Sequence, residues 1–234
     1  MDKKTGVVLL AGGKGTRMHN KVQKQYLPLA GKPLIVHSLE AFERSQADDI
    51  ILVAGAGETG RIRHEIVEYF GFQKVSAVVE GGKERYHSVY AGLSALKNCD
   101  YVLIHDGARP LVTDAIISRM IQGAREYGAC VAGMPVKDTM KMTDGDGFAA
   151  GTPERSRMWQ IQTPQAFAYP LIRRAYDWLM EEECRQTGIT DDAMVLEAYG
   201  GCRIKLVEGS YTNLKVTTPE DMVVAEALLA RGEW

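Results

Sequence analysis

The sequence predicts an α/β protein whose mainly parallel sheet is covered by helices on both faces. Short apolar runs rich in β-branched residues alternate with longer amphipathic stretches along the 234 residues. A glycine-rich loop directly follows the first apolar run. The sequence contains no internal repeat and no linker-like tract, so we expect one domain over residues 1–234.

The predicted elements alternate regularly. Strands are expected at residues 6–10, 49–54, 75–79, 101–105, 130–136 and 203–207. Helices are expected at residues 33–44, 60–70, 85–96, 113–127, 171–183 and 219–229. The last helix opens with Thr218, Pro219 and two acids, which is a favourable N-terminus. Strands that alternate with helices form βαβ units, so a Rossmann-like sheet with parallel strands buried on both faces is expected.

Residues 138–157 interrupt this alternation. Asp144-Gly145-Asp146-Gly147 is a turn signal, and short segments flank it. The pattern alone fits an arm that protrudes from the domain and an ordinary surface hairpin equally well.

Composition and charge disfavour several classes of protein. The formal net charge is −2, whereas general nucleic-acid binders usually carry a basic excess. The first apolar run is too short for a membrane span or a secretory signal. The four cysteines lack the spacing of zinc ligands and are interpreted as reduced thiols. We therefore expect a cytoplasmic protein without a nucleic-acid or membrane partner.

The glycine-rich loop at residues 11–18 is the first candidate for ligand binding. Gly12, Gly13 and Gly15 allow a sharp turn and a close approach to a ligand. The carboxyl end of a strand is where an open α/β sheet binds ligands, and free N–H groups there suit phosphate. The loop is neither a dinucleotide fingerprint, because Met18 takes the third glycine position, nor a P-loop. A glycine turn without a ligand remains an alternative on this pattern alone.

A cluster of cations accompanies this loop. Lys14, Arg17, Lys21 and Lys24 lie within eleven residues of a slightly acidic chain. A triphosphate at the ligand end of the sheet would neutralise them, whereas a solvated basic face is the alternative.

A series of motifs extends over nearly the whole chain. They are AGGKGTRM at residues 11–18, KQYL at 24–27, EGGKER at 80–85, HDGARP at 105–110, VKDTMK at 136–141, QTPQAF at 162–167, TDDA at 190–193 and EGSYTNLKVTTP at 208–219. Together they resemble the 2-C-methyl-D-erythritol 4-phosphate cytidylyltransferase family of the non-mevalonate isoprenoid pathway. The resemblance implies a fold of the nucleotide-diphospho-sugar transferase type, and transfer of CMP from CTP to methylerythritol phosphate with release of pyrophosphate.

The resemblance also implies roles for individual residues. Those assigned to the nucleotide are Ala11, Gly12, Gly13, Lys14, Gly15, Gly82, Ser88 and Asp106. Those assigned to methylerythritol phosphate are Asp106, Arg109, Thr139, Arg155, Thr163 and Lys215. The catalytic set is Arg17, Lys24, Arg155 and Lys215. Mg²⁺ is expected on the triphosphate with Asp106 as its candidate protein ligand, although a ribose contact or a helix cap at Asp106 is the alternative.

In the family that the sequence resembles, the arm at residues 138–157 clasps a second subunit. A homodimer is therefore expected, with Thr139 and Arg155 acting in the partner's site. Gln23, Lys83 and Thr212 depart from residues that are common among relatives: proline at the first position and acidic residues at the other two.

This chemistry agrees with the residue types. The nucleophile is a phosphate oxygen that is already anionic near neutral pH, so no strong general base is required. Arginine and lysine are needed to bring two polyanions together. His105, next to Asp106, is accordingly expected to make a structural hydrogen bond and not to act as an acid or base.

Three other functions are alternatives. Ribitol 5-phosphate cytidylyltransferase shares the glycine loop and the mechanism, but the motifs at residues 107–110, 136–141 and 210–215 favour the methylerythritol enzyme. An NAD-dependent dehydrogenase would need the missing third glycine. A non-catalytic nucleotide sensor would not need the acceptor-side cations Arg155 and Lys215.

Overall fold

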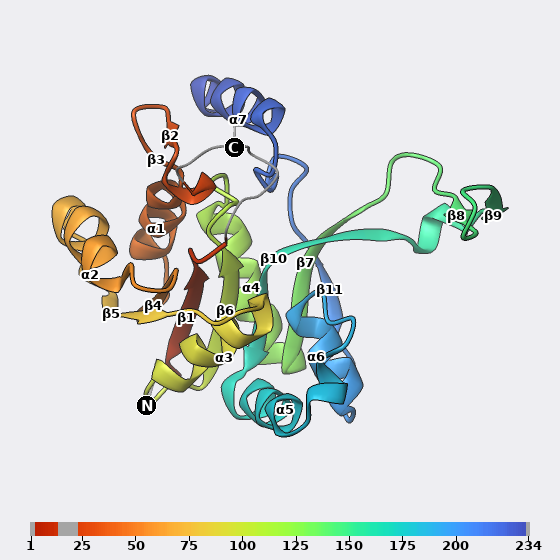
Figure 1. Ribbon diagram of the computed structural model, residues 1–234, viewed down its shortest axis with the longest axis horizontal. Coiled ribbons are helices and arrows are strands. Elements are labelled where there is room, and N and C mark those ends of the chain that lie inside the picture. Colours follow the sequence, from red (N-terminus) through yellow and green to blue (C-terminus); the bar gives the residue numbers. More distant parts are fainter. Residues whose placement is uncertain (1–2, 14–22, 233–234) are drawn as a thin grey trace.

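The computed structural model describes residues 3–13 and 23–232, and a seven-stranded mixed sheet forms its centre (Figure 1). The strand order is β11-β7-β10-β6-β1-β4-β5. The strands are β1 Thr5–Leu10, β4 Asp49–Ala54, β5 Val75–Glu80, β6 Tyr101–Asp106, β7 Ala129–Pro135, β10 Trp159–Ala168 and β11 Lys205–Glu208. All pairings are parallel except those of β10, which is antiparallel to both β6 and β7. The predicted α/β class with a mostly parallel sheet is confirmed.

Helices cover both faces of this sheet, because successive side chains of each buried strand point to opposite sides. Val7 and Leu9 of β1 belong to one core, and Val8 belongs to the other. The first core contains α1 Leu34–Arg44, α2 Thr59–Ile62 with its π-helical continuation Arg63–Glu68, and α4 Asp114–Tyr127. The second contains α3 Arg85–Ala95, α5 Tyr169–Glu181 and α6 Asp192–Tyr199.

A smaller apolar cluster joins the C-terminal helix to the body. The helix α7, Pro219–Arg231, contributes Ala225, which packs with Leu29, Leu34 and Val216. The short hairpin β2 Pro28–Leu29 and β3 Lys32–Pro33 lies beside it. Thr218 caps the helix and Asp221 completes the capping box, as the first-turn residues predicted. In the part of the chain that the structure describes, no helix is both long and apolar enough to cross a bilayer.

The predicted elements agree with the structure except in three places. The strands begin and end within two residues of their predicted bounds, but β10 and α6 were not predicted, and the helix expected at 60–70 becomes π-helical after Ile62. The strand β10 escaped prediction because glutamines and Pro164 interrupt any apolar run. Two of its three glutamines are nevertheless buried: Gln162 is 8% exposed and Gln165 is 1% exposed.

The order of the strands fixes where a ligand site forms. The chain passes from β1 to β4 and β5 on one side, and then returns to β6 on the other side of β1. The connections therefore leave the carboxyl ends of β1 and β6 in opposite directions, which opens a crevice between them. The glycine loop follows β1 and Asp106 ends β6, so both candidate sites meet at this crevice.

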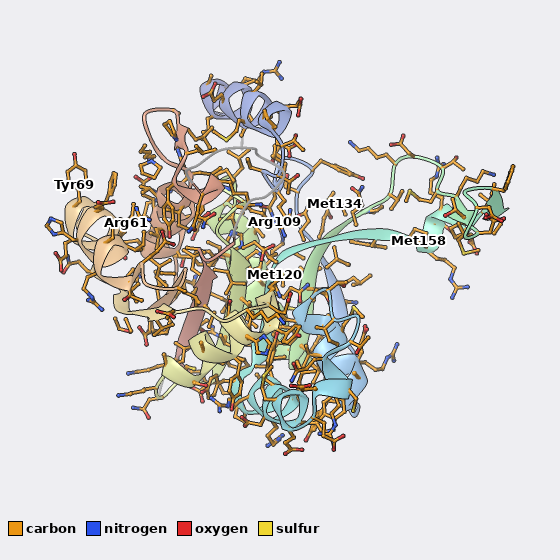
Figure 2. The ribbon with its side chains drawn as sticks, in the orientation of Figure 1. Arg61, Tyr69, Arg109, Met120, Met134 and Met158 are labelled. Carbon is orange, nitrogen blue, oxygen red and sulfur yellow. The ribbon has the colours of Figure 1, made fainter. Side chains whose placement is uncertain are left out.

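The segment between β7 and β10 projects from the body as an arm (Figure 1). Its base continues the β7–β10 pairing, with Trp159 opposite Pro135 and the Val136 N–H donating to the Met158 carbonyl at 3.0 Å. A small hairpin, β8 Met142–Thr143 and β9 Ala149–Gly151, forms its tip. Figure 2 shows Met158 on the way out to this tip, well away from Arg109 over the central sheet.

The hairpin at the tip of the arm follows from the predicted turn. The Asp144 carboxylate accepts hydrogen bonds from the N–H groups of Asp146 and Phe148, and Gly147 has a φ of 87°. Of the two alternatives that the sequence left open, the projecting arm agrees with the structure.

Candidate functional site

A pocket of about 620 Å³ lies at the carboxyl ends of β1, β4, β5 and β6. Its lining includes seven residues that the sequence assigned to the site: Gly12, Gly13, Lys24, Gly82, Ser88, Asp106 and Lys215. The remaining lining consists of six glycines and alanines, Leu10, Gln25 and the charged residues Glu80, Lys83, Glu84 and Arg85. A pocket of this size and lining suits a ligand that is read by backbone groups and held by a few charges.

Two glycines bring the strand ends close together around this pocket. A Cβ on Gly107 would collide with Ile35 and would lie 2.7 Å from the carbonyl oxygen of Leu10. Gly107 instead donates its N–H to that carbonyl at 2.9 Å. A Cβ on Gly12 would lie 3.1 Å from the Ala54 carbonyl oxygen. Both positions therefore favour glycine because backbone passes close to backbone.

The loop between β5 and α3 forms another wall. Glu84 caps α3 and exchanges hydrogen bonds with His87 in a capping box. The Ser88 hydroxyl accepts from the Gly82 N–H at 3.1 Å and donates to the Glu84 carbonyl at 3.2 Å. Ser88 thus fixes the shape of this loop.

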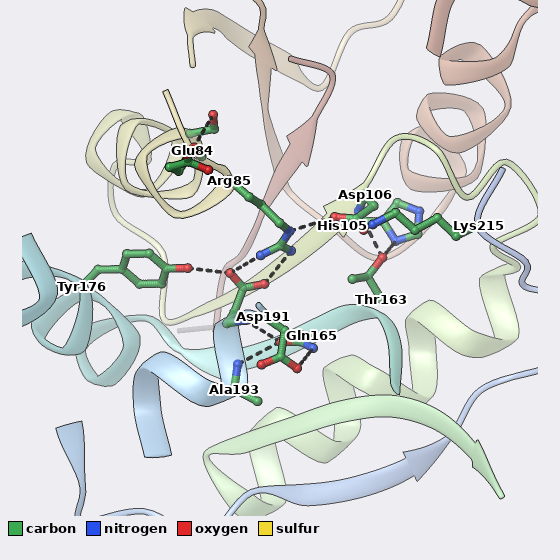
Figure 3. A network of polar contacts seen from close by, with 12 residues as sticks. Glu84, Arg85, His105, Asp106, Thr163, Gln165, Tyr176, Asp191, Ala193 and Lys215 are labelled. Carbon is green, nitrogen blue, oxygen red and sulfur yellow. Dashed lines mark hydrogen bonds and ion pairs between the residues drawn. The ribbon is translucent and has the colours of Figure 1, made fainter. Parts of the chain in front are cut away.

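Asp106 is the most constrained acid of the site (Figure 3). Its Oδ1 accepts from Nε of Arg85 at 3.1 Å, and its Oδ2 accepts from Nζ of Lys215 at 2.7 Å. Burial alone would raise the pKa of this carboxyl group, but Arg85 and Lys215 hold the pKa well below its usual range. Asp106 is therefore an ionised carboxylate with each oxygen already oriented.

Lys215 lies on the segment that precedes α7, and Lys24, from the 3-10 turn Lys24–Tyr26, contacts the same segment. The Val216 N–H donates to the Ala108 carbonyl at 2.8 Å, so this segment runs alongside the residues after β6. Lys215 thereby faces Asp106, while Nζ of Lys24 donates to the Val216 carbonyl at 3.0 Å. Two lysines that are 191 positions apart in sequence thus meet at this segment and both line the pocket.

Arg109 is a buried guanidinium, 9% exposed. Its Nη1 donates to the Asn213 carbonyl at 2.7 Å, while its Nε has no hydrogen-bond partner among the described residues. Burial lowers the pKa of Arg109, which is the expected cost of a cation with few partners. Arg109 is not among the residues that line the pocket, but it lies next to Asp106, whose carbonyl accepts from the Arg109 N–H at 2.9 Å.

Thr163 and His105 support the end of β6 from behind. The Asp106 N–H donates to Thr163 Oγ1 at 3.0 Å, and Nδ1 of His105 lies 3.1 Å from the same oxygen. The other ring nitrogen lies 3.3 Å from the Arg109 carbonyl. Burial lowers the pKa of His105 to about 3, so the ring is neutral near physiological pH. The structural hydrogen bond expected for His105 is present.

Sequence reasoning missed one part of the site. Arg85 belongs to the EGGKER motif but was assigned no role, and it joins Asp106 to Asp192 of α6 (Figure 3). Its Nη1 and Nη2 each donate to one oxygen of Asp192 at 2.8 Å. The sequence contains both residues in recognised motifs, EGGKER at residues 80–85 and TDDA at residues 190–193, but the contact between them depends on folding.

Several assigned residues are not in this pocket. Lys14, Gly15 and Arg17 lie outside the described residues. Thr139 and Arg155 are exposed on the arm, where Nη1 of Arg155 donates to the Lys137 carbonyl at 3.1 Å. The structure thus does not bring these two residues to the pocket of their own chain. Ala11 is buried and does not line the pocket, and its N–H extends the β1–β4 pairing to Val53 at 2.7 Å.

The pocket offers few ligands for a metal ion. Within residues 3–13 and 23–232, no three His, Cys, Asp or Glu side chains are grouped so that they could hold a metal. Asp106 is an ionised oxygen donor facing the pocket, which suits a hard cation such as Mg²⁺. The donors fit a metal that arrives on a polyphosphate and takes a single protein carboxylate.

Comparisons with known proteins extend over nearly the whole chain. A sequence model described as "IspD: 2-C-methyl-D-erythritol 4-phosphate cytidylyltransferase" matches residues 5–231. The protein of that name from Alkaliphilus oremlandii is 49% identical over 228 residues, covering 97% of this chain and 95% of the relative. The one from Lachnoclostridium phytofermentans is 48% identical over 229 residues, covering 98% and 97%.

Solved structures show the same fold. The crystal structure of 4-diphosphocytidyl-2C-methyl-D-erythritol synthase from Anaerococcus prevotii superposes with a TM-score of 0.86 at 32% identity, covering 98% of this chain and 97% of the other. The structure of 2-C-methyl-D-erythritol 4-phosphate cytidylyltransferase from Thermus thermophilus gives a TM-score of 0.77 at 29% identity, covering 97% and 99%.

Proposed function

This chain belongs to the 2-C-methyl-D-erythritol 4-phosphate cytidylyltransferase family, and we propose how its pocket carries out that reaction. CTP and 2-C-methyl-D-erythritol 4-phosphate give 4-diphosphocytidyl-2-C-methyl-D-erythritol and pyrophosphate, which is a step in isoprenoid precursor synthesis. A phosphate oxygen of the acceptor forms a bond to the α-phosphorus of CTP. The bond from that phosphorus to the oxygen bridging to the β-phosphate breaks, and pyrophosphate leaves with the electron pair.

The chemical difficulty is repulsion between two polyanions and not proton transfer. The attacking oxygen is already anionic, so a base is unnecessary, and the neutral buried His105 supplies none. Positioning and electrostatic stabilisation are therefore the main sources of rate enhancement. Fixed cations at the pocket supply both.

CTP occupies the pocket between the glycine loop and the loop before α3. Ala11, Gly12, Gly13, Gly82 and Ser88 line the cytosine and ribose, and the close backbone approaches at Gly12 support this placement. Lys24 holds the triphosphate together with Arg17, and Lys14 and Gly15 belong to the same loop. The lining of the pocket by Gly12, Gly13 and Lys24 supports this part of the proposal.

The methylerythritol phosphate lies on the side of Lys215 and Arg109. Lys215 is partly exposed, with 39% of its side chain accessible, and Asp106 is its ion-pair partner within the described residues. Arg109 is buried next to Asp106, and the positive charge of its guanidinium supports the binding of an anionic acceptor on this side. Thr163 supports Asp106 from behind and so orients this side of the site.

Mg²⁺ accompanies the triphosphate. When bound, the ion withdraws charge from the phosphate oxygens and thereby lowers the repulsion that the acceptor meets. Asp106 is the residue that would hold it, because it is ionised, faces the pocket and keeps further lone pairs on both oxygens.

The arm at residues 138–157 joins two subunits into a homodimer, and Thr139 and Arg155 complete the partner's acceptor site. Two features support this proposal. The arm projects from the body, and Phe148 at its tip is 73% exposed, which is unusual for a phenylalanine without a partner. Arg155 is also exposed, so its charge is available to a second copy of the chain.

The observation that carries the proposed mechanism is the convergence of Lys24, Lys215 and Asp106 at one pocket from three distant parts of the sequence. The test is release of pyrophosphate from CTP plus methylerythritol phosphate and Mg²⁺, with mass spectrometry of the cytidine product. Lys24→Ala is expected to lower turnover by about 10²- to 10³-fold, comparable to the loss of one transition-state donor. Faster turnover with ribitol 5-phosphate than with methylerythritol phosphate would reject the assigned acceptor.

A further inference from the structure

We propose that Arg85 is a positioning residue for the reaction, acting through Asp106 and held in place by Asp192 and Tyr176. Its guanidinium donates Nε to Asp106 and both terminal nitrogens to Asp192. Arg85 therefore spans from the end of β6 to the start of α6 with three charge-assisted hydrogen bonds.

The far end of this bridge is rigid. The Asp192 carboxylate is completely buried, and the Tyr176 hydroxyl donates to its Oδ1 at 2.6 Å. The N–H groups of Asp192 and Ala193 donate to Oε1 of Gln165 at 3.1 and 3.0 Å. Gln165 in turn donates to Asp191, which caps α6. Asp192 is thus fixed by its own backbone as well as by its side chain.

The position of Arg85 has no local explanation. It is the first residue of α3, where the helix dipole disfavours a cation. Burial also opposes its charge, yet Asp192 and Asp106 raise its pKa well above the usual value. A cation retained against both effects indicates that its two carboxylate partners require it.

The two cations that bind Asp106 differ in how firmly they are held. Lys215 binds Oδ2 through one flexible ammonium group, whereas Arg85 binds Oδ1 through a planar group fixed at its other end. Lys215 is therefore able to turn toward a substrate phosphate while Arg85 still holds Asp106. Arg85 keeps Oδ1 of Asp106 in place while ligands bind and leave.

This inference rests on the proposed role of Asp106, so the experiment separates the two. Turnover numbers and both KM values are measured for Arg85→Gln, Arg85→Lys, Asp106→Asn and the double variant Arg85→Gln/Asp106→Asn. Arg85→Gln is expected to lower kcat by about 10- to 100-fold with less than about a threefold change in the KM for CTP. This pattern is expected when a group loses its orientation toward the transition state but substrate binding is retained. Arg85→Lys is expected to recover kcat only partly, because one ammonium group cannot reach both carboxylates in the fork geometry.

The double variant gives the decisive readout. If Arg85 acts through Asp106, the two losses do not add, and the double variant has a kcat within about threefold of Asp106→Asn alone. Additive losses, or an Arg85→Gln kcat within twofold of the wild type, would overturn the inference. Wild-type turnover in Asp106→Asn would instead reject the proposed site.

A matched control measures what the loss of an arginine–aspartate ion pair does outside the pocket. Arg173 of α5 binds Asp177 through three contacts of 2.8 to 3.1 Å and lies outside the pocket lining. Arg173→Gln is expected to lower the melting temperature and to leave kcat unchanged. If Arg85→Gln does not fold, Arg85→Lys, which preserves the charge, provides the same comparison with Asp106→Asn.

Discussion

Nζ of Lys215 lies 2.7 Å from Oδ2 of Asp106, although 109 positions separate the two residues in the sequence. The contact places a cation against the end of β6, where the acceptor phosphate is proposed to meet CTP. The contact also helps to explain why the buried Asp106 stays ionised, because Arg85 and Lys215 together stabilise its negative charge.

Replacement of Lys215 by alanine tests the acceptor side. We expect the KM for methylerythritol phosphate to rise by about 10- to 100-fold, the value of a hydrogen bond between charged groups, with a smaller change in the KM for CTP. Steady-state kinetics with each substrate varied in turn measure both constants. Lys205→Ala, which removes an exposed lysine over Tyr127 outside the pocket, is the control. Equal effects on the two KM values would contradict this assignment.

Mixing of two inactive variants tests the arm. If Arg155 serves the partner's site, Lys24→Ala and Arg155→Ala subunits form mixed dimers in which one site has both residues intact. After free exchange at equal concentrations, about a quarter of the wild-type activity is expected to return, since half of the dimers are mixed and each has one intact site. Arg157→Ala, at a neighbouring exposed arginine of the arm, is the control and should remain active alone. No recovery after demonstrated exchange would place Arg155 in its own subunit's site or in none.

The buried His105 predicts how stability depends on pH. The unfolded chain binds a proton here near pH 6.5, whereas the folded protein excludes it until about pH 3. Protons therefore favour the unfolded state between these values, and the free energy of unfolding falls as the pH decreases from 6.5 toward 3. The contribution of His105 is about 2 kcal/mol between pH 7 and pH 5.

Urea denaturation at pH 7 and pH 5 measures this effect. His37 is also buried with a lowered pKa and adds a loss of the same sign, so the comparison is made with a variant. His105→Gln is expected to lose less stability over this interval than the wild type. An identical loss in both proteins would show that His105 does not contribute.

Addition of a methyl group at Gly107 tests the close approach of β6 to β1. Its Cβ would collide with Ile35 and approach the Leu10 carbonyl oxygen to 2.7 Å, so backbone must move. We expect Gly107→Ala to lower the free energy of unfolding by about 1 to 3 kcal/mol, as overpacking does. Gly145→Ala on the arm, where a Cβ would meet nothing within 4 Å, is the control for the substitution itself. Similar melting temperatures for the two variants would contradict the close approach.

The sequence by itself determined the alternation of strands and helices, because burial on both faces of a parallel sheet requires continuous apolar runs such as residues 49–54. It also determined where the glycine loop lies, since the loop follows the first of these runs directly. The motifs identified the family without any structure, because they extend from the loop to the segment before the last helix. Lys24, which these motifs assigned to the catalytic set, lines the pocket.

Only the tertiary structure decided which of these motifs meet. The strand β10 could not be read from its polar sequence, because its glutamines are satisfied by partners as distant as Asp191 and Ser210. The bridge from Asp106 through Arg85 to Asp192 joins residues up to 107 positions apart in the chain, and no local pattern encodes it. Local propensity fixes an element's type, but the pairing of charged groups depends on the order of strands in the sheet, which only the folded chain establishes.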